Sequence, residues 1–359
     1  MSAVLTRYLA REIVVSTALV TLAFIGLFAF FDFINELDGV GRNGYELHHA
    51  LVYVLLILPG RVYELIPITV LIGTLYALTT LARHSEITVM RASGMSTARM
   101  LRTLAGTGLI FVVLTFAFGE YVAPPAERAA QQWKLTATGS AVSQQLRSGL
   151  WVRDGARFIN VMRVLPDRSM ERVRIYTFDD ERMLSSLSQA VRGEYDAQQR
   201  EWRLIDVVST RFTGSETQLT HEAEVRWRSD LTPEVLSVLM VAPERMQVTT
   251  LYAYIKHLRD NRQNADRFEI ALWKKVFYPF ASLVMIALAL PFAFTHDRMG
   301  GVSVKVFMGV MLGVGFYLLN GLFSNLGVIN AWPPVMAAMT PSLIFLAAAA
   351  VMLLGVERR

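Results

Sequence analysis

The stretch IVVSTALVTLAFIGLFAFF, residues 13–31, carries no charged side chain and is close to the length of about 20 residues that a helix needs to cross a bilayer. Charged residues border it, with Arg11 and Glu12 before it and Asp32 after it. The stretch is longer than the apolar segment of a typical secretory signal, and no small-x-small cleavage site follows it. It therefore predicts a retained first membrane span.

Similar uncharged stretches recur on both sides of a more polar middle section. They cover residues 65–82, 103–119, 276–295 and 306–356. The last run is too long for one helix, and Ser324-Asn325 together with residues 330–334 predict a break into two spans. Hydrophobic residues make up 53% of the chain, more than a soluble core needs. We therefore expect six transmembrane helices, three within residues 1–122 and three within residues 271–359.

Residues 51–60 are apolar but too short to span a membrane, and they end at Pro59-Gly60. Either they form an interfacial or tilted helix leading into the second span, or they belong to one long kinked helix. The sequence does not separate these two interpretations.

The distribution of basic residues predicts the orientation in the membrane. If the N-terminus lies inside, the outer loop at residues 35–50 is acidic on balance, and the inner segments hold most of the basic residues. These are Arg7, Arg11, Arg83, Arg91, Arg99, Arg102, Arg298, Lys305, Arg358 and Arg359. We expect both termini in the cytoplasm and the middle section on the outer side of the membrane. The net charge of +5 is then explained mostly by the basic residues that set this orientation. No nucleic-acid partner is therefore expected.

Within the middle section, residues 123–270, the stretch from about residue 149 to residue 228 alternates apolar and polar residues with the period of a β-strand. Strands are expected at 157–161, 173–178, 201–207 and 225–228, with turns at 153–155, 166–167, 178–180 and 192–194. This pattern predicts an antiparallel sandwich or open barrel, joined to the membrane by connectors at 124–145 and 243–268. Without cysteine, the domain must fold on its core alone. If the β domain has an open edge, it could accept a strand from another protein. The sequence slightly favours the alternative, a stable outer domain whose edge strands are protected from such pairing.

Motifs for common enzymes are missing. The chain has no Gly-x-x-x-x-Gly-Lys-Ser/Thr, no His-Glu-x-x-His and no Gly-x-Ser-x-Gly sequence. His48-His49 is the only histidine pair and has no carboxylates at ligand spacing, so no metal or cofactor is expected. Only Arg61 and Glu64 come near membrane depth, and their spacing suits a structural ion pair. Ion-coupled transport is therefore disfavoured, and any energy should come from a partner.

The cytoplasmic loop RHSEITVMRASG, residues 83–94, predicts a short helix at 85–93. Ser85 can cap it, Glu86 suits its first turn, and Ile87 and Met90 share one face. Ser93-Gly94 should end it, and Ser96 can cap the next helix. Such a helix could sit in a groove of a cytoplasmic motor protein. The pattern alone favours a plain connecting helix.

Several motifs resemble one family. SEITVMRASG at 85–94, Arg7-Tyr8 and EYVAP at 120–124 are similar to sequences of the LptF/LptG family of lipopolysaccharide-export permeases. GLWVRDG at 149–155, LTP at 231–233 and ALWKKVF at 271–277 also match, and resemble LptG members more than LptF members. The resemblance covers essentially the whole chain. It implies a permease subunit of an ABC transporter that extracts lipopolysaccharide from the outer leaflet of the inner membrane, with no enzymatic chemistry of its own.

The resemblance also implies partners and a coupling site. The partners are an LptB-like ATPase dimer, an LptF-like permease that completes a heterodimer, and LptC-like and LptA-like bridge proteins in the periplasm. The middle section becomes a periplasmic β-jellyroll. By the same resemblance, the loop helix is the coupling helix. Glu86 is expected to join the motion of the ATPase to the spans, and Ile87, Met90 and Arg91 are expected to contact the groove of the ATPase.

The lipid-contacting residues are likewise implied by the resemblance. The expected cavity positions are Phe24, Phe30, Ile66, Phe316, Leu319 and Phe323; ordinary packing is the alternative for each alone. Lys134, and more weakly Arg42 and Arg128, are expected to contact lipid phosphates. LptG proteins can carry lysines where the first span ends, but residues 32–38 are acidic here, which disfavours phosphate contact there. The alternative function is a mechanotransmission or scaffold protein that couples an ATPase to the outer domain without lipid passage.

Overall fold

The structure is a computed structural model of the chain. It describes residues 3–42, 44–94, 96–138, 149–165, 169–179, 181, 183–213, 216–229, 231–233, 236, 242–261, 263–294 and 302–357. Within these residues, six helical stretches are long and apolar enough to cross a membrane. The prediction of six spans with an inserted antiparallel β domain is confirmed.

The elements follow one another along the chain in two helical groups. The first group is α1 (Ala3–Leu37), α2 (Leu47–Arg83), α3 (Glu86–Ala92), α4 (Thr97–Ala117), the π-helix η1 (Phe118–Val122) and α5 (Ala123–Thr138). The second group is the 3-10 helix η3 (Pro243–Arg245), α7 (Val248–Asp260), α8 (Asp266–Phe277), the 3-10 helix η4 (Tyr278–Phe280), α9 (Ala281–Phe294), α10 (Val302–Ile329) and α11 (Pro334–Glu357). Helix α7 lies within the connector expected at residues 243–268.

Residues 51–60 lie inside α2, which continues as one helix from Leu47 to Arg83 through Pro59 and Pro67. This supports the interpretation as one long helix. The predicted break in the last apolar run is confirmed at residues 330–333, between α10 and α11. Ser324 and Asn325 do not contribute to it, because both remain inside α10. Pro333 and Pro334 explain the position of the break, since neither has an amide hydrogen to continue a helix.

Helix α2 lies at the centre of the bundle, where α1, α9 and α10 pack around it. Its side chains Leu71, Leu75 and Leu78 are fully buried. The contact with α1 is very close at Gly73, where a Cβ atom would lie 2.5 Å from the Cα atom of Thr17. One helical turn away, the hydroxyl oxygens of Thr21 and Thr69 are 2.8 Å apart. Small and hydroxylated residues therefore let two backbones approach, as they often do in membrane helix pairs.

The inserted domain is a six-stranded antiparallel sheet whose strand order follows the sequence. Its strands are β1 (Leu150–Asp154), β2 (Arg157–Val164), β3 (Met170–Phe178), β4 (Leu184–Asp196), β5 (Glu201–Thr213) and β6 (Glu216–Trp227). Val152 of β1 and Trp227 of β6 belong to the same buried core, together with Trp202. Because β1 and β6 are the two edges of the sheet, a shared core means that the sheet curls around it.

The expected strands are confirmed, and β1 and β4 are additional. The turn expected at residues 192–194 is wrong, because Gly193 lies inside β4 and pairs with Met170 on one side and Leu204 on the other. A Cβ atom at Gly193 would lie 3.1 Å from a Met170 side-chain carbon, so this glycine allows close packing rather than a turn. The turn expected at 166–167 lies outside the described residues.

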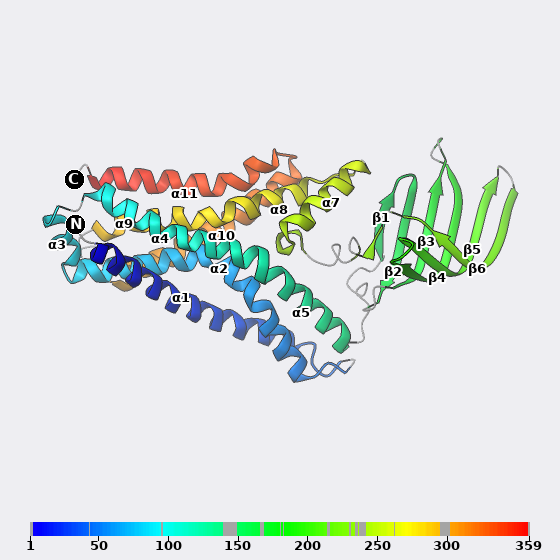
Figure 1. Cartoon of the computed structure of the whole chain (residues 1–359), viewed down its shortest axis with the longest axis horizontal. Coiled ribbons are helices and arrows are strands. Elements are labelled where there is room, and N and C mark those ends of the chain that lie inside the picture. Colours follow the sequence, from blue (N-terminus) through cyan, green and yellow to red (C-terminus); the bar gives the residue numbers. More distant parts are fainter. Residues whose placement is uncertain are drawn as a thin grey trace.

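Figure 1 shows an elongated molecule with the β domain at one end and both termini at the other. We call these the β-domain end and the terminal end of the bundle. Helix α5 leads out to the β domain, and η3 with α7 leads back; these three elements form the stem.

Candidate functional site

Helix α3 lies at the terminal end of the bundle, between α2 and α4 (Figure 1). Ser85 precedes it with a left-handed backbone, φ 60°, and its side chain makes no capping hydrogen bond, so the predicted Ser85 cap is wrong. The predicted end at Ser93 and Gly94 is confirmed, and Gly94 has φ +90°. The Ser96 cap of α4 is also confirmed, since its side chain accepts a hydrogen bond from the Arg99 amide at 3.3 Å.

The two apolar residues of α3 face inward. Ile87 and Met90 are each only 4% exposed and belong to the core of the bundle. The structure therefore does not place them where an outside protein would touch them; they fix α3 to the spans. Val89, which is 66% exposed, and Arg91 lie on the outer face. Glu86 is half-buried and lies near Tyr8 of α1.

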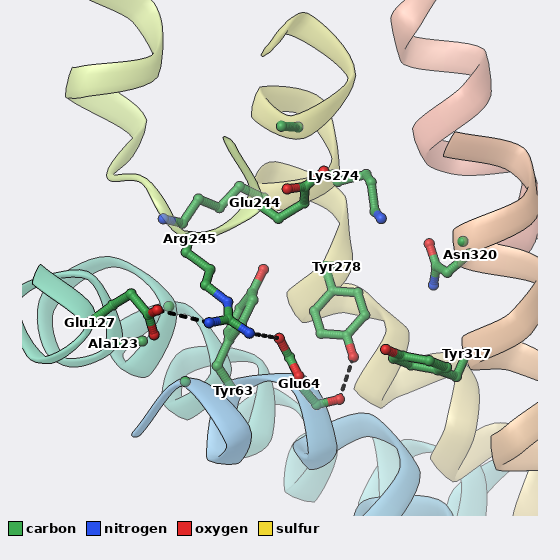
Figure 2. Close-up of a pocket in the computed structure, with 15 residues that line it drawn as sticks. Tyr63, Glu64, Ala123, Glu127, Glu244, Arg245, Lys274, Tyr278, Tyr317 and Asn320 are labelled. Atoms are coloured by element: carbon green, nitrogen blue, oxygen red, sulfur yellow. Dashed lines mark hydrogen bonds and ion pairs between the residues drawn. The ribbon is translucent and has the colours of Figure 1, made fainter. Parts of the chain in front are cut away.

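A cavity of about 230 Å³ lies at the β-domain end, where the stem meets the bundle (Figure 2). Tyr63, Tyr278 and Tyr317 provide aromatic walls from α2, η4 and α10. Its other lining residues are Gly60, Glu64, Gly119, Ala123, Glu127, Glu244, Arg245, Ala271, Lys274, Lys275, Asn320 and Gly321. The cavity thus brings together the stem and four membrane spans.

Beside this cavity, Arg245 of η3 connects the two arms of the stem to each other and to α2. It lies 2.8 Å from Glu127 of α5 and 3.8 Å from Glu64 of α2 (Figure 2). Burial alone would lower the pKa of Arg245, but the Glu127 and Glu64 carboxylates outweigh it and hold the pKa above its ordinary value. Glu64 also pairs with Arg61 at 3.2 Å, which confirms the predicted ion pair, and Arg61 binds Asp32 of α1 at 2.7 Å.

Glu120 of η1 makes a second connection between the stem and the bundle. Both of its carboxylate oxygens accept from the Val248 amide, at 3.1 and 3.0 Å, and so cap the start of α7. The buried Lys275 ammonium lies 3.6 Å from Glu120 and also donates to the Met246 carbonyl. The returning arm of the stem is therefore held by charged groups of the outgoing arm and of the spans.

Replacement of Arg245 by alanine should destabilise this junction. Glu127 is 4% exposed and would lose its cation, which is costly for a buried carboxylate. Since the Arg245 side chain is 35% exposed, we expect the lower part of the usual range, a loss of about 2–3 kcal/mol. Thermal unfolding of the purified chain and limited proteolysis of the stem would measure it. Arg128→Ala removes hydrogen bonds to Gln247 and to the Pro124 carbonyl but no ion pair, so it is the control and should change little. Equal stability of the two variants would contradict the role of Arg245.

The basic residues expected to contact phosphate already have neighbours, or are exposed. Lys134 lies 2.6 Å from Glu36 and 4.6 Å from the centre of the Tyr53 ring. Arg128 donates to Gln247 at 3.2 Å, and Arg42 is exposed. The acidic end of α1 is thus compensated: Asp32 pairs with Arg61, and Glu36 pairs with Lys134. The sequence showed the acidic residues but gave no sign of their partners.

The six expected cavity positions do not share one surface. Phe30 is 59% exposed, while Phe24, Leu319 and Phe323 are partly buried. Ile66 and Phe316 lie in the core; Phe316 is 1% exposed and packs between the Tyr278 and Phe345 rings. In this conformation the side chains of these two residues fill the bundle instead of lining a cavity.

The chain has six spans, a stem that carries a β domain and a short helix packed at the terminal end. These features define a multi-pass membrane protein with an inserted β domain. Among the described residues, no group of three or more His, Asp or Glu side chains is placed to hold a metal ion.

Comparison with known proteins identifies the family. Residues 7–355 match the family described as lipopolysaccharide export system permease LptF/LptG. The chain is 32% identical over 346 residues to lipopolysaccharide export system permease protein LptG of Escherichia coli (strain K12), covering 95% of each chain. It is 30% identical over 342 residues to the protein of the same name from Haemophilus influenzae, covering 95% of this chain and 96% of that one. The chain therefore belongs to the LptF/LptG family.

Proposed function

We propose that this chain is an LptG-type permease subunit of an ABC transporter that extracts lipopolysaccharide from the outer leaflet of the inner membrane. A separate cytoplasmic ATPase supplies the energy, and the lipid passes on to a bridge of periplasmic β-jellyroll domains. The observation that carries the proposal is the family match, which runs from residue 7 to residue 355 and so includes both helical groups, the stem and the β domain.

The proposed orientation follows from the charge bias of the loops. The terminal end, with both termini and α3, lies in the cytoplasm, and the β domain lies in the periplasm. The proposed domains are residues 1–122, 123–270 and 271–359. An LptB-like ATPase dimer binds at α3, an LptF-like permease pairs with the spans, and LptC-like and LptA-like proteins continue the path in the periplasm.

In this proposal α3 moves as a rigid unit and couples the ATPase to the membrane spans. Glu86, Val89 and Arg91 meet the ATPase, while Ile87 and Met90 transmit its movement because they are packed in the core between the spans. The apolar faces of α1 and α10 accept the lipid, with Phe24, Phe30, Leu319 and Phe323 in contact with it. Both helices pack on the central α2, so movement of α2 reaches both faces.

Purification of the chain from its native membranes with its bound partners tests the proposal directly. Mass spectrometry should find an ATPase, a second permease chain and lipopolysaccharide. A photo-crosslinking residue at Phe30 or Phe323 should capture the lipid, and the same residue at the buried Phe316 is the internal control. An ATPase without lipopolysaccharide would favour mechanotransmission, and the absence of an ATPase would overturn the proposed role of α3.

Lys134→Glu is expected to reduce lipid loading by about tenfold, because it removes a charge-assisted contact to phosphate and places two carboxylates opposite each other. Crosslinking at Phe30 measures the loading. The pair Lys134→Gln with Glu36→Gln is the control, since it removes both charges without repulsion. Normal loading in the neutral pair would show that Lys134 serves only its ion pair with Glu36.

A further inference from the structure

A second cavity, of about 470 Å³, lies in the β domain. Three segments meet there: the β1–β2 turn, the β4–β5 turn and the residues that follow β6. Its lining residues are Asp154, Ala156, Arg157, Gln199, Arg200, Arg228 and Ser229. Here Ser229 links the two edges of the sheet, because its hydroxyl, just after β6, donates to Asp154 at the end of β1 at 2.5 Å.

Among the residues that the structure describes, the lining is basic, with three arginines against one acidic residue. Asp154 is occupied by the Ser229 hydroxyl, and Arg228 donates to Glu201 at 3.2 Å. The side chains of Arg157 and Arg200 make no hydrogen bond or ion pair within the part of the chain that the structure describes. Two guanidinium groups therefore line the cavity with their donors available to a ligand.

The backbone holds one of these arginines in a defined and unusual position. Arg200 has φ 56°, in the left-handed region that residues with a Cβ atom seldom adopt. The turn before it is held by Asp196, whose Oδ1 atom accepts from the amides of Gln198 and Gln199 at 2.9 and 3.2 Å. Residues held in such conformations are often found at binding sites.

The position of the cavity relative to the stem is also defined. The Gly155 amide, in the β1–β2 turn, donates to the side-chain oxygen of Asn261 at 3.1 Å, and Asn261 ends α7. One wall of the cavity is thus docked on the arm of the stem that returns to the membrane. The cavity therefore lies beside the contact between the β1–β2 turn and the end of α7.

We propose that this cavity binds phosphate groups, and that its ligand is the phosphate-bearing saccharide headgroup of an amphiphile leaving the membrane. Planar guanidinium groups match the geometry of phosphate with two parallel hydrogen bonds, which a lone ammonium cannot do. The identity of this ligand rests on the proposed function; the phosphate site itself does not. Because the three arginines are exposed, binding should weaken as salt rises.

Titration of the purified full-length chain with inorganic pyrophosphate tests the site. The paired change Arg157→Gln and Arg200→Gln should weaken binding by about tenfold, as expected for the loss of charge-assisted contacts. The matched control is Arg174→Gln with Arg211→Gln, which removes the same charge from exposed arginines outside the cavity and should change binding less than about twofold. Equal weakening in both pairs would overturn the proposal, because binding would then depend only on net charge.

Competition then identifies the source of the phosphate. Lipopolysaccharide with its phosphates intact should displace pyrophosphate, and the dephosphorylated lipid should not. If neither lipid competes, the lipid headgroup is overturned as the ligand and a free phosphate compound takes its place. That outcome leaves the proposed export function intact, since co-purification of the ATPase and the second permease tests it separately.

Discussion

Glu86→Arg should uncouple ATP hydrolysis from lipid release while the spans remain folded. Glu86 is the first residue of α3, is half-buried and interacts with the Tyr8 hydroxyl of α1. Charge reversal places a cation at the positive end of this helix, so the start of the helix is weakened. Loss of a charged contact to the ATPase should lower lipid release per ATP by at least about tenfold.

Parallel measurement of ATP hydrolysis and lipid release in proteoliposomes, with the partner proteins present, would detect this. Tyr8→Phe is the informative comparison, because it removes the hydroxyl but keeps the Glu86 carboxylate available to a partner. We expect a smaller loss for Tyr8→Phe than for Glu86→Arg. Full transport by Glu86→Arg would contradict this role of Glu86. Equal losses of lipid release in the two variants would mean that Glu86 acts within this chain and not at the ATPase.

Gly73→Val should have the largest effect on folding. Any Cβ atom at residue 73 would lie 2.5 Å from the Thr17 Cα atom, and backbone atoms cannot move aside as a flexible side chain can. The α1–α2 contact would have to open and separate the Thr21 and Thr69 hydroxyls, now 2.8 Å apart. Overpacking of this kind lowers the free energy of unfolding by about 1–3 kcal/mol when neighbouring side chains can shift. A larger loss is expected here because backbone atoms must move.

Gly26→Val is a matched control for this change. Gly26 lies in the apolar part of α1, and no atom lies within 4 Å of its expected Cβ position. Both variants replace a helical glycine by valine, so the change in helix propensity cancels in the comparison. Thermal unfolding of the isolated chain in detergent should show a clear loss for Gly73→Val only. Equal midpoints would mean that α1 does not pack on α2 through Gly73.

The spans and most strands could be predicted because each depends on a local pattern: long uncharged runs for helices and alternation for strands. Gly193 shows where a local pattern fails. In sequence it resembles a turn between charged residues, but its neighbours in β3 and β5 decide its conformation. The continuity of α2 through Pro59 depends likewise on packing around the helix, which overrides the tendency of proline to end it.

The site was less predictable, since it depends on contacts between residues far apart in the chain. Helical spacing correctly placed Ile87 and Met90 on one face of α3, but it could not tell whether that face looks to the core or to a partner. The contact of Arg245 with Glu127 joins residues 118 positions apart, and no spacing rule reaches that far. The acidic end of α1 became understandable only when Arg61 and Lys134 were found beside it.

The π-helix η1 gives the protein a way to set the direction in which its β domain points. Phe118–Val122 forms a wider turn inside an otherwise unbroken helical path from α4 to α5, and such a turn holds one more residue than an α-helical turn. Deletion of one residue here would rotate α5 by about 100° about its axis. Glu127 would then turn away from Arg245, and the outgoing arm would leave the membrane facing another way. The number of residues in this segment therefore sets the rotation of α5 about its axis, and with it the direction in which the outgoing arm faces.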